Sequence, residues 1–505
     1  MKNIRFLYTL LFGVAAVLFF GLAYPHHLHY QEQYQLFLFD SNYVWEIVKL
    51  PGGVADLLGR FCTQFFLFAW VGAIIIALLL TAVQLLTLRL ADSPTSQAAE
   101  PLGGWLYGLS FVPSFLLWLF LLDENALLGG VWAILLTLLA SWAFYLLPKG
   151  WTRHILLIAA IPILYFLVGP VCVVFLLLQA LRPKNAVWYY GVFVLLALML
   201  LILASYLPVP ARSLWYGIHY HRYPTAFPVP LWIAALSVFL LALIVRFFHS
   251  GSKSLLPTLL SFVLVAIIMG GLVWKNSNFK AEKVMQYDFM ACHQQWNRIL
   301  ATATAEKPNN QIGVTVQNLA LAMHGMLADH LFDYNQNGIA GLLPDVQSDA
   351  TSPMPTAEAF YQLGMIHVAQ RTVFEAQEAI LDFQKSARCY KRLAQTNLIV
   401  GSYEVARKYL TALQKTLFYR EWANETLPLL GNEKAIAKHP EYGRLRQMAY
   451  DEDFYFSDHV TPEMLESLFY SNTDNRLAYE YLKAYYMLTS DRDGYAKLLL
   501  HFQKQ

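Results

Sequence analysis

Residues 154–184, HILLIAAIPILYFLVGPVCVVFLLLQALRPK, determine the topology of the apolar part of this chain. They form a long apolar run, and a helix needs about 20 such residues to cross the hydrocarbon of a bilayer. Gly169 and Pro170 interrupt the run, and a proline inside a helix removes a backbone donor and clashes with the preceding turn. We therefore expect a kink or a break there. If the segment crosses once, the two ends of the membrane part lie on the same side; if it turns back, they lie on opposite sides.

Seven further apolar segments accompany this one. The eight segments are residues 5–24, 62–90, 104–122, 126–147, 154–181, 185–207, 229–248 and 254–274. Only 14% of the chain is charged, where a soluble protein carries roughly a quarter, and the charges are sparse as far as Trp274. The sequence predicts an all-α protein: a polytopic transmembrane helix bundle over residues 1–275, with one segment re-entrant or broken, followed by a soluble α-hairpin-repeat-like domain over residues 276–505.

Lysines and arginines in the short loops bear on the orientation, because they favour the cytoplasmic side of a membrane. If the 154–184 segment returns, nine lie inside: Lys2, Arg5, Arg89, Lys149, Arg153, Arg182, Lys184, Arg246 and Lys253. Four then lie outside: Lys49, Arg60, Arg212 and Arg222. A single crossing gives seven inside and six outside. We favour the returning segment, although Lys275, Lys280 and Lys283 after the last helix reduce its advantage. The returning segment predicts a multi-pass membrane protein with its C-terminal domain on the outer side.

The densest polar cluster of the membrane half follows the first apolar segment, in YPHHLHYQEQYQLFLFDSNYVWEIVKLPGGVADLLGR, residues 24–60. Its chemistry-bearing side chains are His26, His27, His29, Glu32 and Asp40. Imidazoles and carboxylates act as acid–base pairs near neutral pH, and they also bind metals. A stretch of histidine and tyrosine at a bilayer boundary also serves as a plain interfacial collar. As candidate catalytic residues we take Glu32, Asp40 and His29, with His26 and His27 as substrate contacts; no metal site is predicted.

A second loop, PVPARSLWYGIHYHRYPTAFP over residues 208–228, repeats this chemistry. It contributes His219, His221 and Arg222 as further candidate substrate contacts. The two loops fall on one face of the membrane only if the chain turns back at Gly169. In that case we expect them to form a shared surface.

Other features of the sequence narrow the classes of function. The net charge of +2 does not indicate nucleic-acid binding, and four scattered cysteines fit neither a disulfide framework nor a metal site. The stretch that opens like a calcium loop at Asp333 has Pro344 where that loop needs a bidentate acid. No acid or lysine lies at mid-depth in an apolar segment, which disfavours ion-coupled transport. Gln64, Gln84 and Gln179 are expected to hydrogen-bond between helices. The sequence identifies no cofactor.

The soluble half has helical periodicity throughout. Helices are predicted over residues 284–301 and 313–332, joined by the turn EKPNNQ, and a helix pair is hinged at Gly401-Ser402. Helix–turn–helix units of about 30–40 residues indicate an α-hairpin repeat. These units resemble tetratricopeptide repeats in Trp296 and in the Gly401-x-Tyr403-x-x-Ala406 turn, a resemblance that implies a protein partner bound through residues 276–505.

In layout, the chain is similar to membrane glycosyltransferases of the C superfamily. Those enzymes use an acid in the first outer loop as base or metal contact, with polyprenyl-linked sugar donors. The similarity implies a lipid-linked substrate at the outer leaflet, with Glu32 or Asp40 as base. The first loop lacks the Asp-Asp or Asp-x-Asp pattern, so the similarity is one of architecture.

The whole chain resembles an uncharacterised family of bacterial polytopic membrane proteins with a helical C-terminal half. The resemblance rests on HHLHYQEQYQLFLFD, PGG and FCTQFF near the first loop, the DYNQNG loop and the closing AYEYLKAYYMLTSD. It implies an inner-membrane envelope protein without a defined activity. Two hypotheses follow: an envelope protein whose helical domain binds a partner while the membrane helices anchor it, or an enzyme acting on a lipid-linked substrate.

Overall fold

The computed structural model describes residues 2–91, 104–147, 151–181, 186–207, 209–223, 225–247, 255–344, 353–380, 384–450 and 462–503, and the statements below concern these residues. They form helices and no strand; isolated bridges join Ala126 to His221 and Asn337 to Ile339. The predicted all-α fold is confirmed. All four cysteines are free thiols.

The chain divides into two compact units. The first comprises Met1–Glu32 and Phe39–Phe279, and the second comprises Gln33–Leu38 and Lys280–Gln505. The six residues from Gln33 to Leu38 belong to the first loop in sequence but to the second unit in space. No pattern in the sequence indicates that these six residues pack with the second unit.

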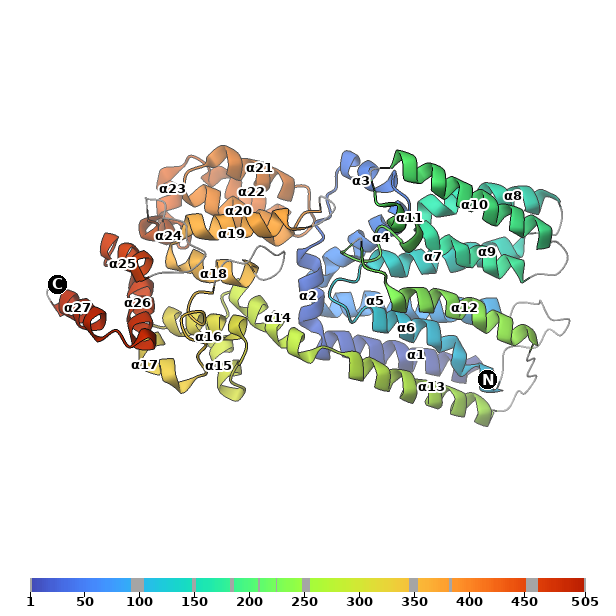
Figure 1. Cartoon of the computed structure of the whole chain (residues 1–505), viewed down its shortest axis with the longest axis horizontal. Coiled ribbons are helices and arrows are strands. Elements are labelled where there is room, and N and C mark those ends of the chain that lie inside the picture. The colour runs from blue at the N-terminus through green and yellow to red at the C-terminus, as the bar shows by residue number, and fades with distance from the viewer. Residues whose placement is uncertain are drawn as a thin grey trace. The chain divides into compact units, whose positions relative to one another are not determined.

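The first unit is a bundle of apolar helices (Figure 1). Its α-helices are α1 (Lys2–Leu18), α2 (Pro25–Gln33), α3 (Ser41–Val48), α4 (Gly53–Thr63), α5 (Ala69–Ala91), α6 (Val112–Phe120), α7 (Leu128–Leu146), α8 (Trp151–Val168), α9 (Cys172–Ala180), α10 (Ala186–Tyr206), α11 (Ala211–Tyr216), α12 (Val229–Phe247) and α13 (Leu255–Asn276). Short π or 3-10 turns extend several of them: η1 (Phe19–Ala23), η2 (Gln64–Leu67), η3 (Gly104–Leu106), η4 (Gly108–Phe111) and η5 (Gly169–Val171).

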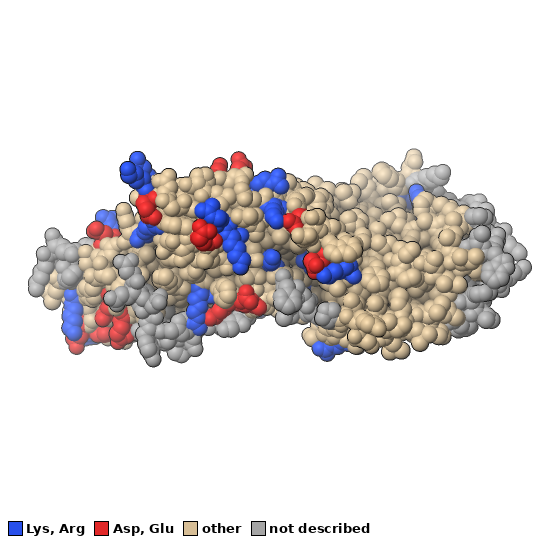
Figure 2. All heavy atoms as spheres, turned by 90° about the horizontal axis from the view of Figure 1, so that it is seen from above, with Lys and Arg blue, Asp and Glu red and all other residues tan. Residues whose placement is uncertain are grey.

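Six stretches of this unit are long and apolar enough to cross a membrane: Asn3–Ala23, Ala69–Ala91, Leu128–Leu146, Arg153–Ala180, Val229–Phe247 and Leu255–Asn276. Two shorter apolar helices, Gly104–Phe120 and Gly191–Tyr206, complete the eight predicted segments. Figure 2 shows few charged side chains on the face of this unit that it draws, whereas charged residues gather over the second unit. The length and apolar composition of these helices therefore indicate a membrane protein.

Hydrogen bonds between helices show which helix ends lie together. At one end of the bundle, Tyr107 Oη donates to the carbonyl of Arg5 at 3.2 Å, and Ser261 Oγ donates to the carbonyl of Gly104 at 3.2 Å. At the other end, the amide of Asn278 donates to Tyr24 Oη at 2.7 Å. The start of α1 and the exit of α13 therefore lie at opposite ends of the bundle.

The chain turns back within the segment of residues 154–184. Gly169 adopts φ +75°, a left-handed conformation open to glycine, and it divides α8 from α9. Arg153 at the start of α8 donates from Nη2 to Gln179 Oε1 near the end of α9 at 3.0 Å. The stretch Arg153–Ala180 has the length of one span but consists of two helices whose outer ends meet.

The glutamines inside the apolar helices follow the prediction in two of three cases. Gln84 on α5 accepts from Thr9 Oγ1 on α1 and donates to Ser110 Oγ, each at 3.1 Å. Gln179 accepts from Arg153. Gln64 differs, because its amide donates to the carbonyl of Phe61 in the adjoining turn.

The second unit consists of short helices arranged mainly as hairpins. They are α14 (Phe279–Cys292), α15 (Trp296–Ala305), α16 (Gln311–Met323), α17 (Leu327–His330), α18 (Pro353–Leu363), α19 (Ile366–Glu378), α20 (Ala387–Ile399), α21 (Tyr403–Leu413), α22 (Arg420–Thr426), α23 (Glu433–Lys438), α24 (Tyr442–Met448), α25 (Pro462–Ser471), α26 (Arg476–Thr489) and α27 (Arg492–Gln503), with the 3-10 turns η6 (Leu331–Asp333) and η7 (Leu427–Leu429).

The hinge at Gly401 is present, between α20 and α21, with φ +85°. Two predicted helices are shorter than expected. The helix over 313–332 ends at Met323, because Gly325 turns with φ +67°, and the helix over 284–301 is divided at residues 293–295.

Candidate functional site

Helix α2 carries the histidine-rich part of the first loop. His26 and His27 are buried and His29 is half-buried. Burial lowers the pKa of His27 to about 4, and the nearby Asp123 carboxylate and the carbonyls of Asp123 and Leu121 only partly oppose this. His27 is therefore a neutral ring at physiological pH, packed beside Tyr24 with a centroid distance of 4.8 Å.

The two acids predicted as candidate bases have different settings. Glu32 is the last residue of α2 that belongs to the first unit. It is buried, with 4% of its surface exposed. Asp40 is the N-cap of α3, and its Oδ1 accepts from the amides of Asn42 at 3.0 Å and Tyr43 at 3.2 Å. A capping carboxylate stabilises the first turn of a helix, typically by about 1 kcal/mol, so Asp40 has a structural task in this loop.

The structure brings the two predicted loops together through a third element, the turn between α6 and α7. Arg222 Nη1 donates to Tyr30 Oη of α2 at 3.1 Å, and the Arg222 amide donates to the carbonyl of Asn125 at 2.8 Å. Gln31 of α2 donates to the carbonyl of Ala126 in the same turn at 3.1 Å. Residues of α2, the 121–127 turn and the 208–228 loop thus share one end of the bundle.

His221 and Asp123 form an acid–histidine pair on this surface. The amide of Tyr223 donates to His221 Nδ1 at 3.1 Å, which assigns the ring proton to Nε2, and Nε2 lies 3.0 Å from Asp123 Oδ2. Burial would raise the pKa of Asp123, but the hydrogen bonds from His221 and from the Asn125 amide hold it below its usual range. Asp123 is an ionised acceptor that orients the imidazole.

A second polar cluster, on α4, is more deeply buried in the protein than the pair of His221 and Asp123. Arg60 Nε donates to Asp56 Oδ2 at 2.9 Å, and His219 Nδ1 lies 3.5 Å from the same oxygen. Burial alone would lower the pKa of Arg60, but the Asp56 carboxylate and Tyr43 raise it above its ordinary value. Asp56 is 1% exposed, and its Oδ1 has no hydrogen-bond partner within the described ranges.

Close packing holds this cluster in place. A Cβ added to Gly59 on α4 would come within 2.4 Å of the Gly129 nitrogen on α7, so the two backbones approach closely. Gly52, with φ +77°, donates to the carbonyl of Tyr165 on α8. Helix α4, which carries Asp56, is therefore positioned by backbone contacts with α7 and α8.

Several residues that contact this site are not predicted by the sequence patterns: Tyr30, Tyr43, Asp56, Arg60 and Asp123. The spacing of Asp56 and Arg60, four residues apart on one helical face, was the available signal for their ion pair. Among the described residues, no group of three or more His, Cys, Asp or Glu side chains could hold a metal ion.

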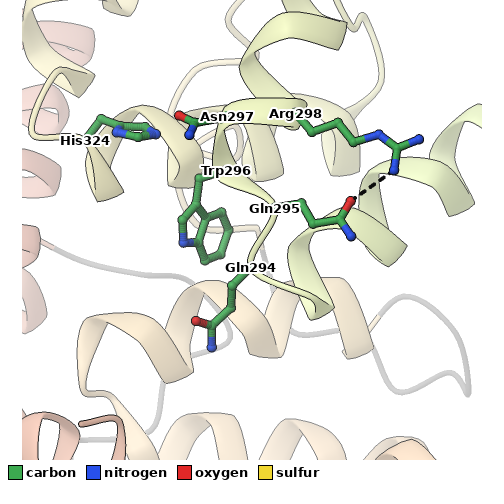
Figure 3. Close-up of a pocket in the computed structure, with 6 residues that line it drawn as sticks. All are labelled: Gln294, Gln295, Trp296, Asn297, Arg298 and His324. Carbon is green, nitrogen blue, oxygen red and sulfur yellow. Dashed lines mark hydrogen bonds between the residues drawn. The ribbon is translucent and has the colours of Figure 1, made fainter.

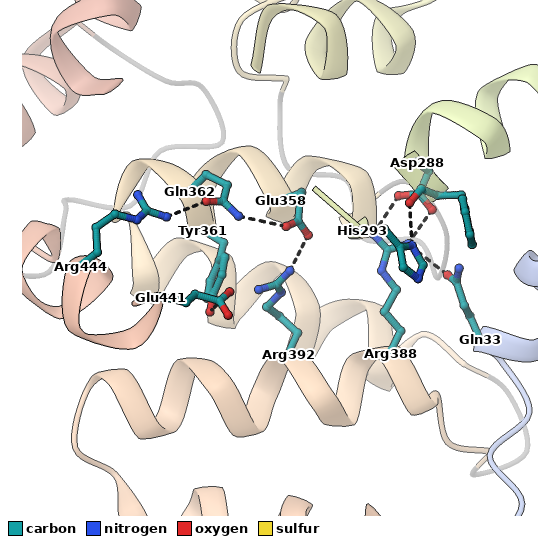
Figure 4. A network of polar contacts seen from close by, with 11 residues as sticks. Gln33, Asp288, His293, Glu358, Tyr361, Gln362, Arg388, Arg392, Glu441 and Arg444 are labelled. Atoms are coloured by element: carbon teal, nitrogen blue, oxygen red, sulfur yellow. Dashed lines mark hydrogen bonds and ion pairs between the residues drawn. The ribbon is translucent and has the colours of Figure 1, made fainter. Parts of the chain in front are cut away.

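Residues 33–38 of the first loop belong to the second unit, where a buried ion pair contacts them (Figure 4). Arg388 of α20 bonds both oxygens of Asp288 on α14, at 2.5 and 2.8 Å, and its Nη1 also donates to Gln33 Oε1 at 3.0 Å. The amide of Leu36 donates to the carbonyl of Lys385 at 3.0 Å. All six residues from Gln33 to Leu38 are buried.

A second set of polar contacts, around Arg392 of the same helix, lies in the core of the unit (Figure 4). Arg392 Nη2 donates to Glu358 Oε2 at 2.5 Å, and its guanidinium lies 3.7 Å from the centroid of the Tyr361 ring. Tyr361 Oη donates to Glu441 at 3.0 Å. Removal of one partner from such a buried pair leaves an uncompensated charge and is strongly destabilising.

Comparison with known protein families assigns the chain to a family. Residues 1–504 match the model of a group described as "Family of unknown function (DUF6057)". No curated protein and no solved structure matches the chain.

Proposed function

Because this chain belongs to DUF6057, a family of unknown function, we propose its role from its own geometry: it is an envelope protein of the bacterial inner membrane whose second unit binds a segment of a partner protein. The apolar helices anchor it in the bilayer. The helical hairpins, which resemble tetratricopeptide repeats, provide the binding surface.

The orientation rests on the fold of the first unit and the charge of its loops. The start of α1 and the exit of α13 lie at opposite ends of the bundle. The positive-inside rule favours the end with the start of α1 as cytoplasmic, by nine lysines and arginines against four. Residues 276–505 are then periplasmic.

The observation that carries the partner proposal is the buried segment from Gln33 to Leu38. This segment contains the last residue of α2, a turn at Tyr34 and four residues without regular secondary structure. The helical unit binds it through a main-chain hydrogen bond at Leu36 and a side-chain contact from Arg388 at Gln33. When a protein binds a peptide segment, main-chain hydrogen bonds contribute affinity and pockets for side chains contribute specificity. We infer that the unit binds a segment of a partner protein by the same chemistry.

Complementation of a deletion strain tests the proposal. A chain that ends at Asn278 keeps the membrane helices, and we expect it to insert but not to complement. The matched variants Glu32→Gln and Asp40→Asn in the full chain are expected to complement fully. Complementation by the truncated chain would contradict the partner proposal.

The second candidate is an enzyme that acts on a lipid-linked substrate at the outer leaflet. It is favoured by the two acid–histidine pairs, Asp123 with His221 and Asp56 with His219, which lie on elements that meet at one end of the bundle. A carboxylate that orients an imidazole is a common arrangement for acid–base catalysis. Glu32 and Asp40 are its candidate bases, with His29 in support and His26, His27 and Arg222 as substrate contacts.

For this candidate, Asp123→Asn, His221→Gln and Glu32→Gln should each abolish complementation while the protein still accumulates in the membrane. Glu124→Gln, next to Asp123 in the same turn, is the control. Full complementation by all three variants would exclude the enzyme.

A further inference from the structure

The second unit has a hollow of about 400 Å³ that none of the contacts above uses (Figure 3). It lies where two interhelical turns meet, the turn between α14 and α15 and the turn after α16. Its lining residues are Gln294, Gln295, Trp296, Asn297, Arg298 and His324. The volume falls in the range of small-molecule sites, roughly 300–1,000 Å³.

Trp296 forms the apolar wall of this hollow. The indole packs partly against the hydrophobic core that includes Met290 and Ile299, and it is half-buried, so one part of the ring is anchored and another part lines the hollow. In Figure 3 the indole points toward the side chain of Gln294, and the side chains of Asn297 and His324 lie next to each other on its other side. A fixed aromatic ring presents an apolar face without a large loss of conformational entropy on binding.

The polar groups around the indole are amides, a guanidinium and an imidazole. Gln294, Asn297 and Arg298 are exposed, and Arg298 Nη1 donates to Gln295 Oε1 at 3.3 Å. Amides offer donors and acceptors together, and a guanidinium offers a planar fork of donors. The hollow therefore combines one apolar wall with several neutral hydrogen-bonding groups and one cation.

Gln294 has an unusual backbone. It adopts φ +54° after the end of α14, where the amide of Gln295 donates to the carbonyl of Met290 at 2.8 Å and closes the helix. Glycine is the usual residue at such helix ends, and in this unit glycines take positive φ at Gly325, Gly364, Gly401 and Gly431. A glutamine here keeps a polar side chain at the hollow at a cost in backbone strain.

We propose that this hollow is a binding site for a sugar ring. A pyranose has an apolar C–H face that fits against an indole and an edge of hydroxyl groups that pair with amides, imidazole and guanidinium. The proposal stands apart from the partner proposal, because none of the residues from Gln33 to Leu38 lines the hollow.

The test uses the full chain in phosphatidylcholine nanodiscs, because maltoside and glucoside detergents are themselves sugars. Saturation-transfer NMR and calorimetry are run with N-acetylglucosamine, glucose and glucuronate. For ligands of this size we expect a Kd between about 0.1 and 10 mM. Trp296→Ala and Asn297→Ala should each weaken binding at least about tenfold. A greater affinity for glucuronate that is lost in Arg298→Gln assigns the acidic sugars.

Two glycine variants separate binding from stability. Gln294→Gly removes the side chain and relieves the backbone, so we expect binding to weaken about three- to tenfold while the unfolding temperature is unchanged or raised. Ser490→Gly relieves the same conformation, φ +58°, at the end of α26 and should leave binding unchanged. Absence of binding by all three sugars, or equal binding by the wild type and both Trp296→Ala and Asn297→Ala, overturns the proposal.

Discussion

Arg153 and Gln179 lie 26 residues apart in sequence, and their side chains are joined by a buried hydrogen bond of 3.0 Å. In one continuous helix these residues would be separated by about 39 Å, at 1.5 Å per residue. The bond therefore requires that α9 return along α8. Because the pair adds no net crossing, the remaining apolar helices leave the two ends of the first unit on opposite sides.

Cysteine accessibility measures this arrangement in cells. In a chain with Cys62, Cys172, Cys292 and Cys389 replaced by serine or alanine, we expect a cysteine at Asn276 to react with an impermeant maleimide in spheroplasts. A cysteine at Gly251, which lies in the connection between α12 and α13, should react only after the membrane is opened. The reverse pattern would mean that the segment crosses once or that the N-terminus is outside.

The turn between α8 and α9 should depend on glycine at position 169. Alanine there must adopt φ +75°, and its Cβ would lie 2.8 Å from Tyr220 Oη, which donates to the carbonyl of Val168. We expect Gly169→Ala to destabilise the first unit by about 1–3 kcal/mol, measured as thermal unfolding of the solubilised chain. Gly191→Ala is the control, because Gly191 lies inside α10 with no atom within 4 Å of an added Cβ. Equal effects of the two variants would show that the turn does not depend on glycine.

Much of the fold follows from the sequence because its causes are local. Apolar length predicts the eight segments, and Gly169-Pro170 predicts the break in one of them. Gly401-Ser402 predicts a hinge for the same reason, since glycine adopts positive φ readily. The division at residues 293–295 has no such signal, because glutamine is not a helix breaker and its conformation there depends on tertiary context.

The candidate site is less predictable because its contacts are distant in sequence. Tyr30 and Arg222 are 192 residues apart, and His221 and Asp123 are 98 apart. Patterning showed that the two loops were rich in histidine and aromatic residues, but only the packing of α4, α6 and α7 determines which acid meets which imidazole. The capping role of Asp40 is local in origin, because its Oδ1 accepts from the amides of Asn42 and Tyr43; its role as a base stays a prediction.

The ion pair of Asp288 and Arg388 should be important for the second unit. Burial would lower the pKa of Arg388, but the Asp288 carboxylate raises it well above its ordinary value, so Arg388 is charged. Arg388→Leu leaves a buried carboxylate without its partner, and we expect a loss of about 3–5 kcal/mol. For a unit of this size that is a fall of roughly 6–20 °C in Tm.

Two further variants examine the cause of this loss. Arg388→Leu combined with Asp288→Leu should recover most of the stability, because no unpaired charge remains. Arg407→Leu breaks the exposed pair with Glu404, in which the atoms are 3.6 Å apart, and should cost less than about 1 kcal/mol. If the double variant were no more stable than Arg388→Leu alone, burial of an unpaired charge would not be the reason.

Buried His27 should make the first unit sensitive to mild acid. Its pKa is lowered from 6.5 to about 4 by burial, so the unfolded chain binds a proton more readily than the folded chain. The stabilising contribution is complete above pH 6.5 and is lost as pH falls toward 4, with about 2 kcal/mol lost by pH 5. Asp123 does not add to this window, because its lowered pKa makes its contribution fall only in stronger acid.

We expect the unfolding temperature of the wild type to decrease between pH 7 and pH 5, and His27→Asn to reduce that decrease. His330→Asn removes an exposed histidine as the control; identical pH profiles for the wild type and His27→Asn would refute the assignment.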